Sequence, residues 1–91
     1  HVSLRFIERK LAALGSDGDA HDLLETFKVY CETFFSKQQA AERLHLHRNT
    51  LSYRLQKVEE RLGISMQDFK QVTAFYLALY MRELGNRGGS R

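Results

Sequence analysis

The 91-residue sequence contains no proline and no tryptophan, and it has a single cysteine, Cys31. Without proline, no helix loses an internal backbone donor or is forced to kink, and the helical spacing of apolar residues predicts an all-α domain. One cysteine cannot form a disulfide within the chain, which fits a reducing compartment. The chain also lacks a run of about eighteen apolar residues and a signal-peptide pattern. We therefore expect a cytoplasmic protein without a membrane span.

The bulk composition indicates the size of the fold and the kind of partner. A chain of 91 residues, of which 43% are hydrophobic and 11% aromatic, suffices for one small domain with a core. Its net charge of +3 favours a polyanionic partner such as nucleic acid. Because the chain does not begin with methionine, we expect a fragment from the end of a longer protein.

The stretch from residue 48 to residue 62 has two faces of different chemistry. Its apolar residues recur at helical spacing and form one stripe: Leu51, Leu55, Val58 and Leu62. At about 100° per residue, four polar residues fall on the opposite side: Asn49, Tyr53, Gln56 and Lys57. A helix that buries leucine and presents donors and acceptors is a candidate for insertion into the DNA major groove. We expect Gly63 to end this helix.

Residues 36–44, directly before it, predict a second and shorter helix. Ser36 is a candidate N-cap, and a glutamine three residues later completes a capping box. Two adjacent alanines give this helix a small inward face that lets another helix cross closely. The link 45–47 has the length of a helix-turn-helix turn. Within the link, His45 occupies the position where such motifs often carry a left-handed glycine.

Three further amphipathic helices are expected, which makes about five in a small bundle. The first covers residues 2–14, and the second covers residues 19–35 with Asp19 as its N-cap. The apolar stripe of the second helix comprises Leu23, Leu24, Phe27, Tyr30, Cys31, Phe34 and Phe35. The last helix is expected to begin at Ser65, which can cap it, and to run to about residue 84.

The last helix is apolar around much of its circumference, which is more than a solvated helix of a monomer needs. We therefore expect its surface, with Phe75 and Tyr80 as candidates, to meet a second subunit or an upstream domain. The expected organisation is a lead-in helix and turn over residues 1–18, a DNA-binding domain over residues 19–84, and a flexible glycine-rich tail over residues 85–91.

Signals for catalysis or metal binding are weak. His45 and His47 lie two residues apart without a cysteine or carboxylate cluster of metal-ligand spacing. The glutamates share their helices with basic residues, as solvated pairs do, and the sequence has no nucleophile elbow or phosphate-binding loop. We expect no enzyme activity, no catalytic residue, no metal and no cofactor. Cys31 is expected to be an inert packed thiol, with redox sensing as the minor alternative.

Two stretches resemble a known family. Residues 23–30, LLETFKVY, and residues 40–55, AAERLHLHRNTLSYRL, are similar to the C-terminal helix-turn-helix of the PucR/CdaR regulators. These bacterial transcription factors include sugar-diacid and purine-catabolism regulators, and the resemblance covers about residues 22–82. It implies a cytoplasmic bacterial regulator with an upstream sensor domain that acts as a dimer or higher oligomer. The sequence departs from the family at Phe34-Phe35, where a polar turn is usual, and at Ser52, where a basic residue is common.

The resemblance places the first turns of the recognition helix at residues 47–53. Base contacts are expected from His47, Arg48, Asn49, Thr50, Ser52 and Tyr53, and phosphate contacts from Lys37, Gln38, Arg43, Arg54 and Lys57. Arg48 and Asn49 are the best candidates for bidentate contacts to guanine and adenine, respectively. Two assignments stay open: Tyr53 could instead pack across the helix pair, and Arg54 could form a structural salt bridge.

The predicted function is therefore sequence-specific binding of double-stranded DNA. The rival interpretation is a helical protein–protein interaction module that uses the apolar last helix. Salt dependence separates the two, because DNA binding weakens steeply with added salt whereas apolar association does not. RNA binding is less well supported, since the sequence lacks the exposed aromatic platform of single-strand readers.

Overall fold

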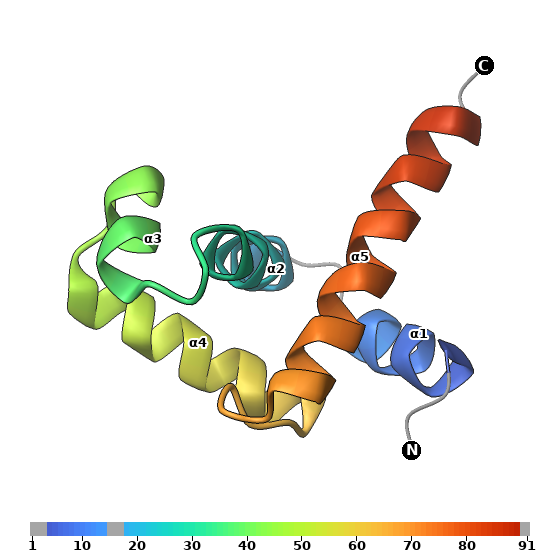
Figure 1. The fold of residues 1–91 in the computed structure, drawn as a ribbon, viewed down its shortest axis with the longest axis horizontal. Coiled ribbons are helices and arrows are strands. Elements are labelled where there is room, and N and C mark those ends of the chain that lie inside the picture. The colour runs from blue at the N-terminus through green and yellow to red at the C-terminus, as the bar shows by residue number, and fades with distance from the viewer. Residues whose placement is uncertain (1–3, 15–17, 90–91) are drawn as a thin grey trace.

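The computed structural model describes residues 4–14 and 18–89, and within those ranges the chain forms five helices and no strand. The helices are α1 Leu4–Ala13, α2 Gly18–Glu32, α3 Lys37–Leu44, α4 Arg48–Leu62 and α5 Phe69–Gly89. α2 lies between α3 and α5, α4 runs beneath α2 and α3, and α1 crosses α5 near its start (Figure 1). The prediction of a small all-α bundle with a helix-turn-helix is confirmed.

Local signals set the bounds of α3 and α4. The Ser36 hydroxyl accepts a hydrogen bond from the backbone N–H of Gln39 at 3.2 Å, so Ser36 is the N-cap of α3, as predicted. At the other end of α3, His45 takes the left-handed conformation with φ 58°. Its N–H and that of Leu46 donate to carbonyls of the last turn, as in a Schellman motif. Gly63, with φ 69°, ends α4 as predicted.

The connection between α2 and α3 differs from the prediction. α2 ends at Glu32, and both Phe34 and Phe35 have left-handed backbone with φ 57° and 63°. The Phe34 side chain is 89% exposed, so its predicted place in the core is wrong. Only the second phenylalanine packs on other rings, because the turn directs Phe35 toward Tyr30 and Phe69, with centroid distances of 5.5 and 5.8 Å.

The predicted N-caps of α2 and α5 are both wrong, because each helix begins at a different residue than expected. α2 already begins at Gly18, so Asp19 lies in its first turn rather than at the cap. α5 begins at Phe69, and the Asp68 carboxylate accepts the N–H of Gln71 at 3.3 Å. The predicted cap, Ser65, instead accepts the N–H of Gln67 in the connection that precedes α5.

α5 continues to Gly89 and so enters the expected glycine-rich tail. Residues 85–89 are therefore helical, while residues 90 and 91, like residues 15–17 of the expected turn, lie outside the described residues. In the part of the chain that the structure describes, no helix combines the length and the apolar composition that a membrane crossing requires.

The buried side chains form two clusters. The first, called the large core, joins α1, α4 and α5 with the start of α2 and contains Ile7, Leu11, Leu14, Ala20, Leu23, Phe27, Val58, Leu62, Ile64, Val72, Phe75, Ala78 and Leu79. The second, called the small core, lies beneath the helix-turn-helix and contains Val29, Tyr30, Ala40, Ala41, Leu51 and Leu55. Met66 packs against both. α4 spans the two cores and thereby joins the helix-turn-helix to the rest of the domain.

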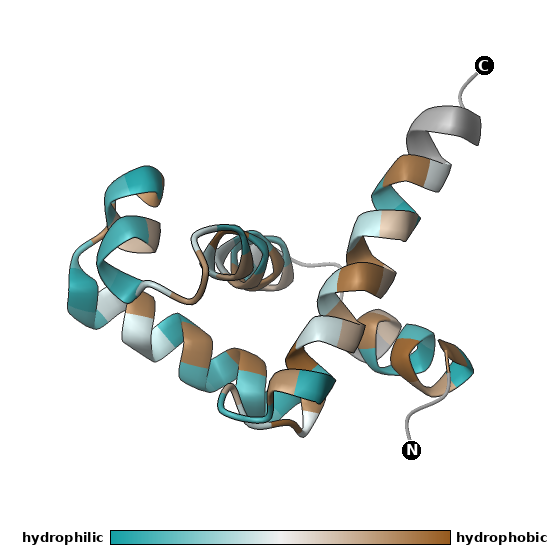
Figure 2. Ribbon diagram, in the orientation of Figure 1, coloured by the Kyte–Doolittle hydropathy of each residue, from teal (hydrophilic) through white to brown (hydrophobic). Residues whose placement is uncertain are grey.

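Phe75 is fully buried in the large core, so its predicted place on an oligomer surface is wrong. Tyr80, the other candidate, is 46% exposed. The apolar surface of α5 is instead formed by Leu77, Met81 and Leu84 beside Tyr80, and brown bands recur along α5 as it rises away from α1 (Figure 2).

Candidate nucleic-acid interface

The orientation of α4 about its own axis follows from its apolar stripe. Its four predicted inward residues are all buried, with 3% exposure or less: Leu51, Leu55, Val58 and Leu62. Ala40 and Ala41 on α3 face the same small core and are also buried. Side chains this small allow α3 to approach α2 and α4 closely, which holds the rotation of α4. The polar side of the recognition helix is consequently turned to solvent.

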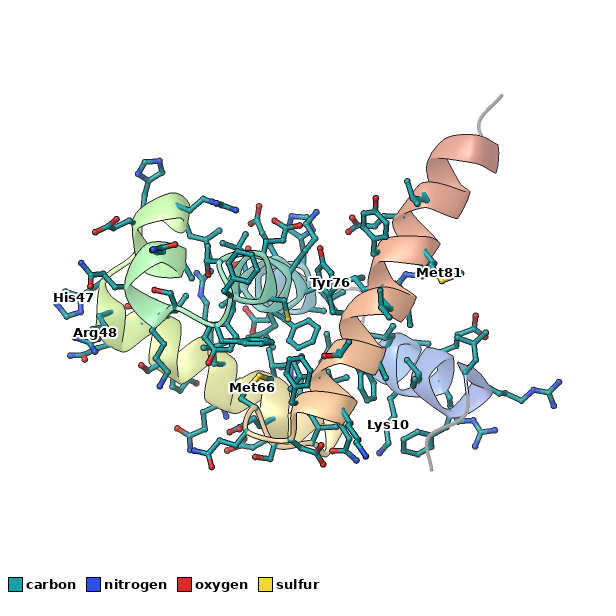
Figure 3. The ribbon with its side chains drawn as sticks, in the orientation of Figure 1. Lys10, His47, Arg48, Met66, Tyr76 and Met81 are labelled. Carbon is teal, nitrogen blue, oxygen red and sulfur yellow. The ribbon has the colours of Figure 1, made fainter. Side chains whose placement is uncertain are left out.

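The N-terminal end of α4 is exposed to solvent. His47 is its N-cap, and the Nδ1 atom accepts the N–H of Asn49 at 3.0 Å. Because Nδ1 accepts, the proton of the neutral ring lies on Nε2, which leaves an N–H donor for an outside partner. His47 and Arg48 project from the outer end of α4 (Figure 3). The side chains of Arg48, Asn49 and Thr50 are exposed, and Arg48 forms no ion pair with any described residue.

The next turn of α4 carries the remaining predicted base contacts. Tyr53 is 59% exposed, and the Lys57 ammonium lies 5.6 Å from its ring centroid. This contact stays within α4, and Tyr53 also lines a cleft that α4 forms with α2. Ser52 is half-buried and lines a hollow with Lys37 and Gln56. The predicted base contacts therefore extend over the first two turns of one helix.

The predicted phosphate contacts are more dispersed. Lys37 and Gln38 are exposed at the N-terminal end of α3. The other three each face a carboxylate: Arg43 lies 3.6 Å from Glu32, Arg54 lies 3.9 Å from Asp22, and Lys57 lies 3.6 Å from Glu60. In the free protein, Arg54 thus lies beside a carboxylate of another helix, but at a distance too long for a hydrogen bond. Positive charge at the flanks of α4 is therefore partly neutralised before any partner binds.

Two acidic residues and one arginine at this surface were not among the predicted site residues. Asp19 and Asp22 on α2 line a cleft of about 390 Å³ together with Arg54 and Lys57. Arg61 lines the same cleft and also donates to the Leu14 carbonyl at 3.1 Å. The sequence carries no local signal for this grouping, because it depends on α2 lying across the middle of α4.

The remaining candidate groups show structural rather than chemical environments. Burial, and to a lesser degree the nearby Glu32 carboxylate, raises the pKa of the Cys31 thiol to about 12. The thiol is thus protonated near neutral pH, as the interpretation of an inert cysteine requires. Within residues 4–14 and 18–89, no group of three or more histidine, cysteine, aspartate or glutamate residues is placed to hold a metal ion.

The profile of the PucR C-terminal helix-turn-helix domain matches residues 23–81, which include most of α2, all of α3 and α4, and α5 as far as Met81. The chain belongs to this family. As a PucR helix-turn-helix domain it is a DNA-binding domain of a transcriptional regulator, which confirms the main functional prediction. No solved structure matches the chain.

Three relatives from Bacillus subtilis (strain 168) illustrate the similarity. The purine catabolism regulatory protein is 47% identical over 62 residues, which are 68% of this chain and 12% of that protein. The uncharacterized protein YsfB is 36% identical over 67 residues, or 74% of this chain and 18% of its own length. The proline-responsive transcriptional activator PutR is 31% identical over 80 residues, or 86% of this chain and 20% of its own length. The chain thus spans a fifth or less of these relatives.

Proposed function

We propose that α4 enters the DNA major groove with its first turn leading and that Arg48 and Asn49 read bases there. The observation that carries this proposal is the contrast between the two sides of α4, with leucines buried on one and Arg48 exposed without an ion pair among the described residues on the other. An arginine without an intramolecular partner can form a bidentate contact to guanine at no cost of a broken salt bridge. His47, Thr50, Ser52 and Tyr53 lie on the same two turns and would complete the base contacts.

Phosphate contacts on both flanks would set the register of α4. Lys37 and Gln38 lie at the N-terminal end of α3, where the helix dipole and free backbone N–H groups favour an anion. Arg43 is more than half exposed despite its contact with Glu32. It would contact a phosphate of the same DNA strand as Lys37 and Gln38. Arg54 and Lys57 would contact phosphates along α4 itself.

The test is the affinity of Arg48→Ala for duplexes that the unmodified chain selects from a random-sequence pool. The expected loss is about 1–3 kcal/mol on the selected site, with relaxed preference at one position. Arg5→Ala is the matched control, because Arg5 is an exposed arginine on α1 outside the interface. Equal affinity of the two variants at fixed salt would overturn the assignment of Arg48.

We further propose that the domain acts as a dimer whose two copies read half-sites about 34 Å apart on one face of the duplex. The support is a groove of about 370 Å³ between α1 and α5, which is lined by Leu4, Leu11, Ala78 and Met81. Glu8 and Arg82 also line it, so two copies related by a two-fold axis could place opposite charges against each other. Met81 lies far from His47 (Figure 3), which would leave the recognition helices free.

The mass of the chain in solution, measured by sedimentation over a range of concentrations, tests the dimer. Met81→Glu places a charge in the groove and should shift the protein to the monomer. Phe34→Glu is the control, since it replaces another exposed apolar residue, which lies outside the groove. A monomer at all concentrations for the unmodified chain, or an equal effect of both variants, would contradict the proposed surface.

We also infer a place for this domain in a longer protein. Two of the relatives that it matches are a purine catabolism regulatory protein and a proline-responsive transcriptional activator, and the match covers only a small part of each. This supports a cytoplasmic bacterial regulator in which an upstream domain senses a signal and residues 19–84 bind DNA. Ligand-dependent protection of an operator by the longer protein, but not by this domain alone, would be the expected result.

A further inference from the structure

The cleft between α2 and α4 places acidic residues against predicted DNA contacts. Its α4 wall includes Thr50, Tyr53, Arg54 and Lys57, and its α2 wall includes Asp19 and Asp22. A carboxylate beside a DNA phosphate is repelled, so the acidic wall is not itself a phosphate contact. Its presence at this place requires a different explanation.

Arg54 is the residue most directly affected by the acidic wall. Its side chain is 27% exposed, and Nη2 lies 3.9 Å from Oδ2 of Asp22, whose side chain is 50% exposed. This distance is too long for a hydrogen bond, so the pair is a loose ion pair open to water. Such pairs contribute little free energy, and a stronger anion can replace the carboxylate.

The backbone at Asp22 is fixed within α2, whereas its side chain is half exposed. The backbone carbonyl of Asp22 accepts the hydroxyl of Thr26 at 2.8 Å, and Thr26 is fully buried. Lys57, the other cation of the cleft, has its own contacts within α4, to Glu60 and to the ring of Tyr53. Among the ion pairs of the described residues, only the one between Asp22 and Arg54 joins α4 to a carboxylate on another helix.

We propose that Asp22 is a positioning residue that holds Arg54 in the free protein and competes with DNA for it. On binding, the guanidinium leaves Asp22 and contacts a backbone phosphate, with which it can form two parallel hydrogen bonds. Asp22 thus keeps Arg54 oriented toward the flank of α4. It also reduces the attraction of Arg54 to DNA whose major groove α4 has not entered. This proposal rests on the proposed function, since it assumes that α4 enters the groove.

The experiment is a double-mutant cycle between Asp22→Asn and Arg54→Gln, with affinity measured on one selected duplex at several salt concentrations. Asp22→Asn keeps the shape of the side chain and removes its charge, so it should tighten binding by about two- to five-fold. Arg54→Gln should weaken binding. In the Arg54→Gln background the gain from Asp22→Asn should largely disappear, because the competition for the arginine no longer exists.

Glu25→Gln is the matched control, because it makes the same charge change on the same helix. Glu25 lines a different hollow, beside Leu79 and Arg82, so its effect should be clearly smaller than that of Asp22→Asn. Thermal unfolding of each variant checks that the fold is retained, and Asp22→Ser serves as a second variant if Asp22→Asn fails to fold.

The outcomes separate this inference from the proposed function. One outcome is that the unmodified chain binds duplex DNA, with weaker binding by Arg48→Ala and no effect of Asp22→Asn. This result would overturn only the inference that Arg54 moves from Asp22 to a phosphate. An equal gain from Asp22→Asn with and without Arg54 would also overturn it, since that result indicates simple repulsion between Asp22 and DNA. If the unmodified chain does not bind duplex DNA at all, the proposed function fails and this inference fails with it.

Discussion

The two cores of the domain are built differently, although α2 and α4 contribute to both. The large core is filled mainly by long and aromatic side chains such as Phe27, Leu62 and Phe75, whereas the small core includes Ala40 and Ala41 from α3. Large side chains bury more apolar area and supply most of the stability. Small ones let three helices approach closely and so hold the rotation of α4. The large core therefore stabilises the fold, and the small core positions the recognition helix.

The basic residues along α4 also differ, because only some of them are paired with a carboxylate. At the end that lies over the small core, Arg48 is exposed and forms no ion pair with a described residue, whereas farther along the helix Arg54 and Lys57 each face a carboxylate. A free arginine suits recognition of a base, and a loosely paired one suits a contact made only when DNA is seated. If the two cores have separate roles, substitutions in them should affect stability and DNA affinity differently.

The largest effect is expected in the large core. Phe75→Ala should lower the free energy of unfolding by about 3–5 kcal/mol, because it removes a fully buried ring and leaves a cavity. Denaturant unfolding, followed by far-ultraviolet circular dichroism, measures this loss. If the cores are coupled through α4, the whole domain should unfold in one transition. A second transition that retains helix would show that the helix-turn-helix is stable on its own.

A smaller loss of stability, but a larger loss of function, is expected in the small core. Ala40→Leu overpacks a fully buried site and should cost about 1–3 kcal/mol of stability. Because it displaces α3 from α4, DNA affinity should fall under conditions in which the variant is still folded. Ala12→Leu, at an exposed position of α1, is the control and should change neither quantity. Normal DNA affinity of folded Ala40→Leu would contradict the positioning role of the small core.

The smallest effect is expected at the turn that leads into the helix-turn-helix, and it should be stabilising. Phe34 has left-handed backbone and an exposed ring, so Phe34→Asn should raise the free energy of unfolding by about 1 kcal/mol, since asparagine tolerates this conformation better. Phe35→Asn provides the comparison, because it removes the ring contacts to Tyr30 and Phe69 and should not stabilise. Thermal unfolding of both variants distinguishes strain from packing. Equal shifts in the same direction would contradict this distinction.

Much of the helix-turn-helix was predictable from the sequence because its signals are local. The cap at Ser36, the left-handed turn at His45 and the stop at Gly63 each depend on hydrogen bonds between residues a few positions apart. The buried stripe of α4 follows from helical periodicity in the same way. These signals determine where the recognition helix begins, where it ends and which side faces out.

Tertiary packing decided the features that no local signal contains. Phe75 and Tyr80 both fit an apolar face of α5, and only the contact with α1 and α2 determines that Phe75 is buried and Tyr80 is not. Phe34 fits the stripe of a longer α2, yet the turn that seats Phe35 against Phe69 leaves it in solvent. The pairing of Asp22 with Arg54 joins residues on two helices. Such contacts depend on how helix faces meet in space, and helical periodicity within one segment carries no information about that.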